Sequence, residues 1–252
     1  MRELARRRDE LDEFAFISYE PRKGIAERLK ISPTRSFFGK TVDELWDAVN
    51  LDIDILVENL VGGKISDEAD PLLYFSAGEL IKPGFQFPFP QNDREVLGLC
   101  SCCKQADRLR HIPMLDFRAE APTKTDTMAR TLELIAKALI RNGAPDGVIL
   151  CSGDSFHYYG LDPLDEIDWR EFMLRSLLLE PLIDVRYIAH RLLSGKATLR
   201  ITSSRSKPAM PYVAACLRRS GVWWSICTSD LHTETAALLE THNSSQLSEM
   251  QG

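Results

Sequence analysis

The sequence predicts a layered domain of the α/β or α+β class, in which helices pack on a sheet core. Three segments support this prediction. Residues 94–117 indicate two strands around a polar turn at 104–107, residues 125–143 indicate an amphipathic helix, and residues 146–160 indicate a buried strand, a turn and a second strand. Strands and helices that alternate along a chain are expected to form packed layers rather than a helical bundle.

The helix expected over residues 125–143 is the clearest element of the sequence. Its apolar residues recur at i, i+3, i+4 and i+7, which places them on one face. Thr125 or Asp126 is suited to the N-cap, and Gly143 to the C-cap. A second helix is expected from Asp168 to Glu180, ended by Pro181, and one more strand is expected within residues 197–208.

The chain before residue 91 has a different composition and is predicted to be a mostly helical extension. Residues 42–60 keep apolar residues at helical spacing and end before a Gly-Gly pair. Residues 71–90 are rich in Pro, Gly and Phe, which indicates an irregular connection. We therefore expect an extension over residues 1–90, the main domain over 91–240, and a flexible tail over 241–252.

The composition is that of a globular protein, with 44% hydrophobic and 27% charged residues in a chain of 252. No apolar run reaches the roughly 18 residues that span a bilayer. The charged N-terminus is not followed by the apolar segment of a secretory signal. A cytoplasmic protein that does not contact a membrane is expected.

The cysteines allow two interpretations. Cys100 and Cys103 form a C-x-x-C pair, and His111 lies close enough in sequence to contribute a third zinc ligand. A structural zinc site usually has a second pair at compatible spacing, and none follows nearby. The alternative is that these residues are buried or half-buried thiols in a reducing compartment.

Positive charge is concentrated in one part of an otherwise acidic chain. The net charge is −6, yet residues 185–229 contain no Asp or Glu. This segment is suited to a local anion site, and the alternative is a solvated face that pairs with acidic helices. Its basic residues are Arg186, Arg191, Lys196, Arg200, Arg205, Lys207, Arg218 and Arg219.

Acidic residues follow two strand-like or apolar segments of the main domain. Asp116 ends an apolar run, Glu120 comes soon after it, and Asp184 ends a second run. Nucleotidyl transfer needs carboxylates that hold divalent metal ions against the phosphates and the attacking hydroxyl. Asp116 and Asp184 are therefore candidate ligands of Mg²⁺ or Mn²⁺.

Small and basic residues near these carboxylates are suited to phosphate binding. A turn of small residues exposes backbone N–H groups, and imidazole or cationic side chains add donors and charge. The candidate nucleotide-binding residues are Ser152, Gly153, Ser155, His157, Arg200, Ser204 and Lys207.

Three motifs in this order resemble the archaeo-eukaryotic primases. MLDFR, containing Asp116, is similar to the first acidic motif of that family, and SGDSFH is similar to its Ser-Gly-x-x-x-His turn. LID, with Asp184, followed by LRITSSRSK, is similar to the third motif. The resemblance implies a primase-polymerase-like sheet core, Mg²⁺ or Mn²⁺ as cofactor, catalytic roles for Asp116 and Asp184, and nucleoside triphosphate and single-stranded nucleic acid as partners.

The chain departs from the family pattern at the first motif. Arg118 stands where the family usually has a second acidic residue, and a cation there repels a metal ion. Glu120 faces the same side of an extended strand and is the candidate replacement. Asp154 also places a negative charge near the proposed phosphate site.

These departures keep two alternatives open beside an active nucleotidyltransferase. One is a catalytically inactive primase-like subunit that interacts with a protein partner or senses nucleotides. The other is an unrelated α/β domain whose motifs match by accident.

Overall fold

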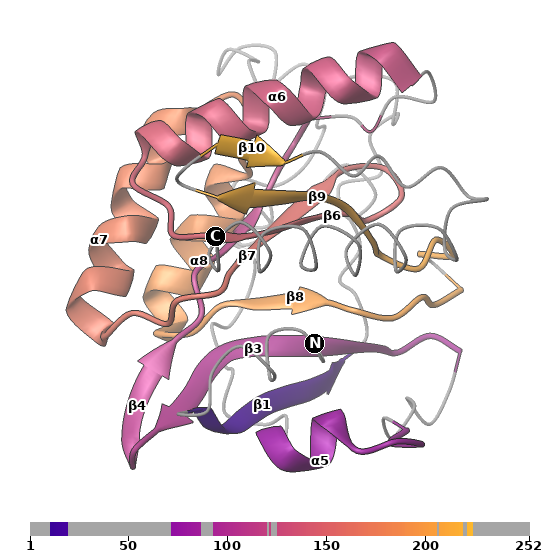
Figure 1. The fold of residues 1–252 in the computed structure, drawn as a ribbon, viewed down its shortest axis with the longest axis vertical. Helices are drawn as coiled ribbons and strands as arrows, with labels where there is room; N and C mark the ends of the chain where they lie inside the picture. The colour runs from indigo at the N-terminus through magenta and orange to yellow at the C-terminus, as the bar shows by residue number, and fades with distance from the viewer. Residues whose placement is uncertain are drawn as a thin grey trace, which may run out of the picture.

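The computed structural model describes residues 11–19, 72–86, 93–119, 121, 125–205, 207–218 and 221–223. These residues form two sheets with helices packed against them (Figure 1). Every strand pairing between them is antiparallel. The fold is therefore of the α+β kind, which confirms the predicted class.

The first sheet is centred on a long strand, β3 (Val96–Gln105). Its path is β2-β1-β3-β4, and β8 also pairs with β3, with Gly98 opposite Arg200. A short helix, α5 (Ala77–Ile81), packs against β1 below this sheet in Figure 1. The other strands are β1 (Leu11–Tyr19), β2 (Leu73–Ser76), β4 (Arg108–His111) and β8 (Thr198–Arg200).

The second sheet has the order β10-β9-β6-β7-β5. Its strands are β5 (Met114–Asp116), β6 (Gly147–Cys151), β7 (Phe156–Gly160), β9 (Tyr212–Arg218) and β10 (Gly221–Trp223). The helices that accompany it are α6 (Thr125–Arg141), α7 (Glu166–Ser176), the 3₁₀ helix η1 (Leu177–Leu179) and α8 (Val185–Ser194). In Figure 1, α6 lies along β9 and β10, while α7 and α8 stand together at one end of the sheets.

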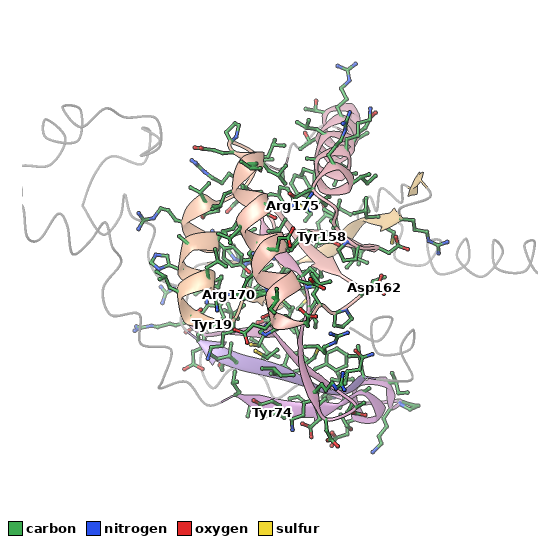
Figure 2. The ribbon with its side chains drawn as sticks, turned by 90° about the vertical axis from the view of Figure 1, so that its left-hand side faces the viewer. Tyr19, Tyr74, Tyr158, Asp162, Arg170 and Arg175 are labelled. Atoms are coloured by element: carbon green, nitrogen blue, oxygen red, sulfur yellow. The ribbon has the colours of Figure 1, made fainter. Side chains whose placement is uncertain are left out.

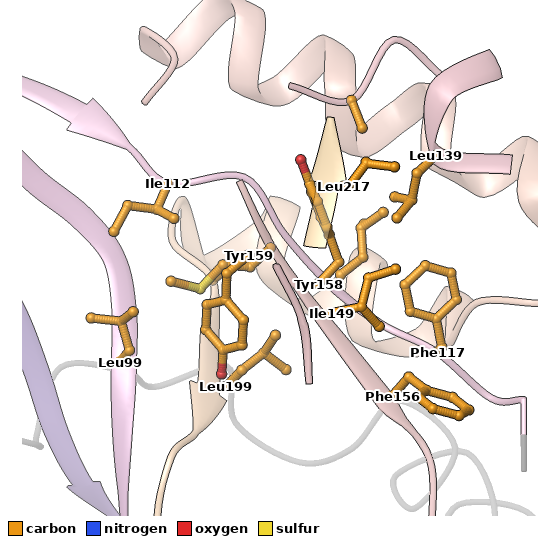
Figure 3. Close-up of a cluster of buried hydrophobic side chains, with 14 of the residues drawn as sticks. Leu99, Ile112, Phe117, Leu139, Ile149, Phe156, Tyr158, Tyr159, Leu199 and Leu217 are labelled. Carbon is orange, nitrogen blue, oxygen red and sulfur yellow. The ribbon is translucent and has the colours of Figure 1, made fainter. Parts of the chain in front are cut away.

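Both sheets contribute to one hydrophobic core. Figure 3 shows part of this cluster. In Figure 1, β8 lies on the side of β3 that faces the second sheet. The labelled side chains include Leu99 and Leu199 from the first sheet, Ile149 and Leu217 from the second, and Leu139 from α6. The shared core fixes the two sheets relative to each other, so residues at the ends of their strands have defined positions. No helix in the described part of the chain is long and apolar enough to cross a membrane.

The local predictions for the main domain are confirmed. The turn at 104–107 joins β3 to β4, and Ala106 and Asp107 have φ angles of 47° and 60°, as a tight two-residue hairpin requires. The helix expected after residue 125 is α6, and Gly143 beyond its end has a φ of 79°. The strand–turn–strand expected over residues 146–160 is the pair β6 and β7.

The prediction of a helical extension is wrong for the segment Leu11–Tyr19, and the irregular connection expected over residues 71–90 contains the strand Leu73–Ser76. Both are strands, and β1 lies between β2 and β3 in the first sheet. The consecutive residues Phe14, Ala15, Phe16 and Ile17 are all buried, so both faces of β1 are covered and its sequence lacks the polar–apolar alternation that identifies a strand. The helix predicted over residues 42–60 and the tail over 241–252 lie outside the described residues.

Candidate functional site

Asp116 and His157 face each other across two neighbouring strands. They are directly opposite in the pairing of β5 with β7, and Asp116 Oδ1 lies 3.7 Å from His157 Nε2. The His157 side chain is 7% exposed, whereas that of Asp116 is 31% exposed. The sheet register alone therefore brings the first and second motifs into contact, although about 40 residues separate them in sequence.

Asp184 lies against Asp116 through the backbone. Its N–H donates to the carbonyl of Asp116 at 2.9 Å. The Asp184 side chain is the N-cap of α8, and its Oδ1 accepts hydrogen bonds from the N–H groups of Arg186 (2.9 Å) and Tyr187 (3.1 Å). The third motif thus reaches the same place as the other two, but one oxygen of its carboxylate is already used to begin a helix.

Asp116 and His157 both favour their neutral forms. Burial first, and the Asp184 carboxylate second, raise the pKa of Asp116 to about 7, although Lys207, Arg200 and Arg191 oppose the shift. Burial, followed by the charges of Arg200 and Lys207, lowers the pKa of His157 to about 3. The distance of 3.7 Å is longer than a hydrogen bond, and with His157 neutral the contact is not an ion pair of two charged groups.

The small-residue turn of the second motif is held on two sides. The N–H of Ser152 donates to the carbonyl of Ser155 at 2.8 Å, and the Ser155 hydroxyl donates to the carbonyl of Phe117, next to Asp116. Gly153 has a φ of 103°, and a Cβ there would lie 2.6 Å from the Cβ of Ala209. Only glycine fits this position, so the turn is fixed between the end of β5 and the loop after β8.

Arg200 joins this turn to the loop after β8. Its Nη1 donates to the carbonyls of Thr202 (3.1 Å) and Ala209 (2.8 Å), and its Nη2 donates to the carbonyl of Ser152. The residue is buried, and burial lowers its pKa. Arg200 was predicted as a phosphate ligand, whereas most of its donors here bind backbone carbonyls. These hydrogen bonds hold the turn at 152–155 against the loop after β8.

Ser204 and Lys207 form a second turn beside the first. The N–H of Ser204 donates to the carbonyl of Lys207 at 2.9 Å, and the N–H of Lys207 donates back at 3.1 Å. The Lys207 ammonium lies 3.5 Å from Asp154 Oδ2, and their side chains are 47% and 89% exposed. Such an exposed pair is weak, so an anion of higher charge can replace Asp154 as the partner of Lys207.

The described residues do not form a metal site. Within them, no three His, Cys, Asp or Glu side chains come together in a way that could hold an ion. Asp116 and Asp184 are adjacent, but the Asp184 carboxylate caps α8, and Glu120 lies outside the described residues. The charges that act on Asp116 instead include three cationic side chains. An Mg²⁺ or Mn²⁺ ion held by Asp116 and Asp184 would therefore need the phosphates of a bound nucleotide as further ligands.

The cysteines near β3 are free thiols. Cys100 and Cys103 are buried, and the Sγ of Cys103 lies 3.6 Å from the carbonyl of Arg110. The His111 ring stacks on Trp169 with the ring centroids 4.6 Å apart. These residues follow the buried-thiol alternative.

Tyr19 and Tyr187 are absent from the sequence predictions for this region, and Arg191 is predicted only as one of the basic residues of the segment 185–229. Burial raises the pKa of Tyr19 to about 12, and the charges of Arg191, Asp116 and Arg200 also act on it. Tyr19 ends β1, which was predicted to be helical, and the other two lie on α8, which was left unassigned. The signal for α8 was present, since Asp184 precedes apolar residues at helical spacing.

The fold and the site define a class: an α+β domain in which an acidic strand end, an acidic helix N-cap, a Ser-Gly turn with a histidine, and a basic turn converge. Comparison with protein families agrees. Residues 87–211 match the family described as archaeo-eukaryotic primase 1D-like, and this range contains all three motifs. The chain is therefore related to the primase superfamily, which confirms the resemblance seen in the sequence. Searches of curated proteins and of solved structures found no match.

Proposed function

We propose that this primase-like protein binds the triphosphate of a nucleotide at the two turns beside Asp116, and single-stranded nucleic acid next to it. The main support is the way Arg200 ties the small-residue turn at 152–155 to Thr202 and Ala209, the residues of the loop after β8 that flank the basic turn at 204–207. This construction holds backbone N–H groups and the Lys207 ammonium at the edge of the acidic pair. Primase-family membership of this segment gives the ligand class.

The binding chemistry follows from the groups at the two turns. Lys207 leaves Asp154 and pairs with a phosphate, because a phosphate carries more charge than one exposed carboxylate. Neutral His157 can donate one hydrogen bond from its ring, and the N–H groups of the turn at 152–155 can donate others. The ligand displaces an exposed ion pair and breaks no buried contact.

Nucleotidyl transfer is the second candidate function. One observation favours it: Asp184 lies against Asp116 and raises its pKa, which is the arrangement of two carboxylates that share a site. Mg²⁺ or Mn²⁺ would supply the charge for phosphate activation there. Among the described residues no three potential ligands come together, so the remaining ligands of such an ion would be nucleotide phosphates, and the inactive, nucleotide-sensing alternative stays open.

The test is calorimetric titration of a nucleoside triphosphate into wild-type protein and the variant Lys207→Gln. The substitution removes one charge-assisted contact, so we expect affinity to fall about tenfold. Lys137→Gln is the matched control, since Lys137 also forms an exposed ion pair, with Glu133 on α6. Equal affinities of wild type and Lys207→Gln would remove the basic turn from the site. Absence of saturable binding to the wild type would reject the proposed function.

A further inference from the structure

One face of α8 carries three polar side chains that lead away from Asp116. Asp184 caps the helix, and Tyr187 and Arg191 follow at i+3 and i+7, which are positions on the same face. The backbone hydrogen bond from Asp184 to Asp116 fixes the start of this face at the acidic pair. At a rise of 1.5 Å per residue, Arg191 lies roughly 10 Å further along the helix axis.

Arg191 and Tyr187 are packed together and have buried polar atoms without partners. The guanidinium carbon lies 5.3 Å from the centroid of the Tyr187 ring. Among the described residues, no hydrogen-bond partner is found for the buried Nε of Arg191 or for the hydroxyl of Tyr187, a residue that is only 9% exposed. Buried donors are nearly always satisfied in proteins, so this pair is suited to an external acceptor.

Arg191 and Lys207 are two of the cationic side chains that act on Asp116. Both lower the pKa of Asp116. Lys207 also acts on His157, whereas Arg191 acts on Tyr187 and Tyr19. Figure 2 shows Tyr19 where the end of β1 approaches the helices. Asp116 is therefore close enough to feel both the basic turn that holds Lys207 and the α8 residue Arg191, which packs on Tyr187.

We propose that Arg191, stacked on Tyr187, is a second anion-binding position that takes a phosphodiester group of single-stranded nucleic acid. This inference rests on the proposed function, in which the nucleotide triphosphate occupies the Lys207 side. Stacking on an aromatic ring leaves the N–H edge of a guanidinium available for phosphate oxygens. Tyr187 and Tyr19 remain protonated at neutral pH and can donate to the same anion, because burial raises the pKa of both.

The experiment compares two ligands on the variant Arg191→Gln. Binding of a labelled single-stranded oligonucleotide is followed by fluorescence anisotropy across a salt series, and triphosphate binding is followed by calorimetry. We expect about tenfold weaker strand binding, from the loss of one charge-assisted contact. The slope of log affinity against log salt should fall by roughly 0.7 for one phosphate contact in a single strand. Triphosphate affinity should change less than about twofold.

Matched variants and a wild-type measurement complete the design. Arg170→Gln is the control, because Arg170 is an exposed arginine of α7 (Figure 2) in an ion pair with Glu166. Arg191→Lys keeps the charge and should recover part of the strand affinity and the full salt slope. In the wild type, bound oligonucleotide should protect Arg191 from modification by phenylglyoxal, read by mass spectrometry, and this readout does not depend on how a variant folds.

Each result decides the proposal. Loss of strand binding alone, with Arg191 protected, supports it. Wild-type strand affinity in Arg191→Gln, or no protection of Arg191, overturns it while triphosphate binding by the wild type leaves the proposed function intact. Equal loss of both ligands in a folded variant would place Arg191 in the triphosphate site and would also overturn it. A wild type that binds neither ligand would reject both proposals together.

Discussion

The two sides of Asp116 are built differently. On the Lys207 side, the donors that hold the turns have partners within the protein: Arg200 binds three carbonyls, and Ser155 binds the carbonyl of Phe117. The buried Nδ1 of His157 is the exception there, with no partner among the described residues. On the α8 side, the buried polar atoms of Tyr187 and Arg191 have no partner among the described residues. The first side is a frame whose shape the protein maintains by itself. On the α8 side, the Tyr187 hydroxyl and the Arg191 Nε are unsatisfied donors that a bound ligand can accept from.

The largest expected effect is on the free energy of unfolding, and it tests the difference between the Lys207 side and the α8 side. Arg200→Met leaves three carbonyls without their donor, and each buried unsatisfied acceptor costs roughly 1–3 kcal/mol. We expect a loss of about 3 kcal/mol in the free energy of unfolding, measured in urea. Arg191→Met, which breaks no hydrogen bond of its Nε, should lose less than about 1 kcal/mol. Equal losses in the two variants would contradict the comparison.

The next largest effect is the dependence of the free energy of unfolding on pH that Asp116 causes. The pKa of Asp116 is raised from 3.8 to about 7, so the folded state holds a proton that the unfolded state releases. Its contribution to stability is complete below about pH 4 and is lost as pH rises through 7. The variant Asp116→Asn has no titrating carboxyl group at this position, so it should not lose this stability as pH rises. Relative to wild type, the variant should gain roughly 2 kcal/mol between pH 5 and pH 8, after allowance for the partial exposure of Asp116.

Urea unfolding of both proteins at the two pH values measures that gain. His157 has a lowered pKa and loses stability as pH falls below its unfolded value of 6.5, which is the opposite direction. Because both proteins retain His157, its contribution largely cancels in the difference. A constant difference between Asp116→Asn and wild type from pH 5 to pH 8 would show that Asp116 is ionised throughout.

The smallest effect concerns the metal. Arg118→Asp restores the acidic spacing of the primase motif beside Asp116. If Lys207, Arg200 and Arg191 supply the positive charge beside Asp116 in place of a metal ion, Arg118→Asp should bind Mn²⁺ about tenfold more tightly than wild type, measured by calorimetry. If wild-type protein instead extends a primer with Mg²⁺ or Mn²⁺, and Asp116→Ala abolishes the activity, the protein is an active nucleotidyltransferase. Glu120→Ala would then be the damaging change, and Arg118→Asp would do little.

The sequence was sufficient for the residues that lie at the ends of strands. Asp116, His157 and Asp184 each follow or belong to an apolar segment whose type could be predicted locally, and their order matched a known pattern. The register of β5 with β7 and one backbone hydrogen bond then bring them together. The fold class was predictable for the same reason, since α6, β6 and β7 have strong local patterns.

The remaining features depend on contacts between distant segments. Tyr19 reaches the site only because β1 pairs with β3, about 80 residues later. Both faces of β1 are covered, so its sequence lacks the polar–apolar alternation that would predict a strand. Arg200 is a reasonable phosphate ligand by sequence, but its Nη1 and Nη2 atoms donate to three carbonyls of two loops, the turn at 152–155 and the loop after β8. Asp184 could be predicted as a metal ligand, while its capping role depended on α8, which had not been assigned.

The central claim is that a nucleotide triphosphate lies at the two turns beside Asp116, and a crystal structure with a non-hydrolysable nucleoside triphosphate tests it most directly. We predict phosphate oxygens within about 3.2 Å of the Lys207 ammonium, with His157 and the backbone of the turn at 152–155 as further donors. Asp154 should no longer contact Lys207. Density for the nucleotide at any other place on the protein, with the Lys207–Asp154 pair intact, would contradict the claim.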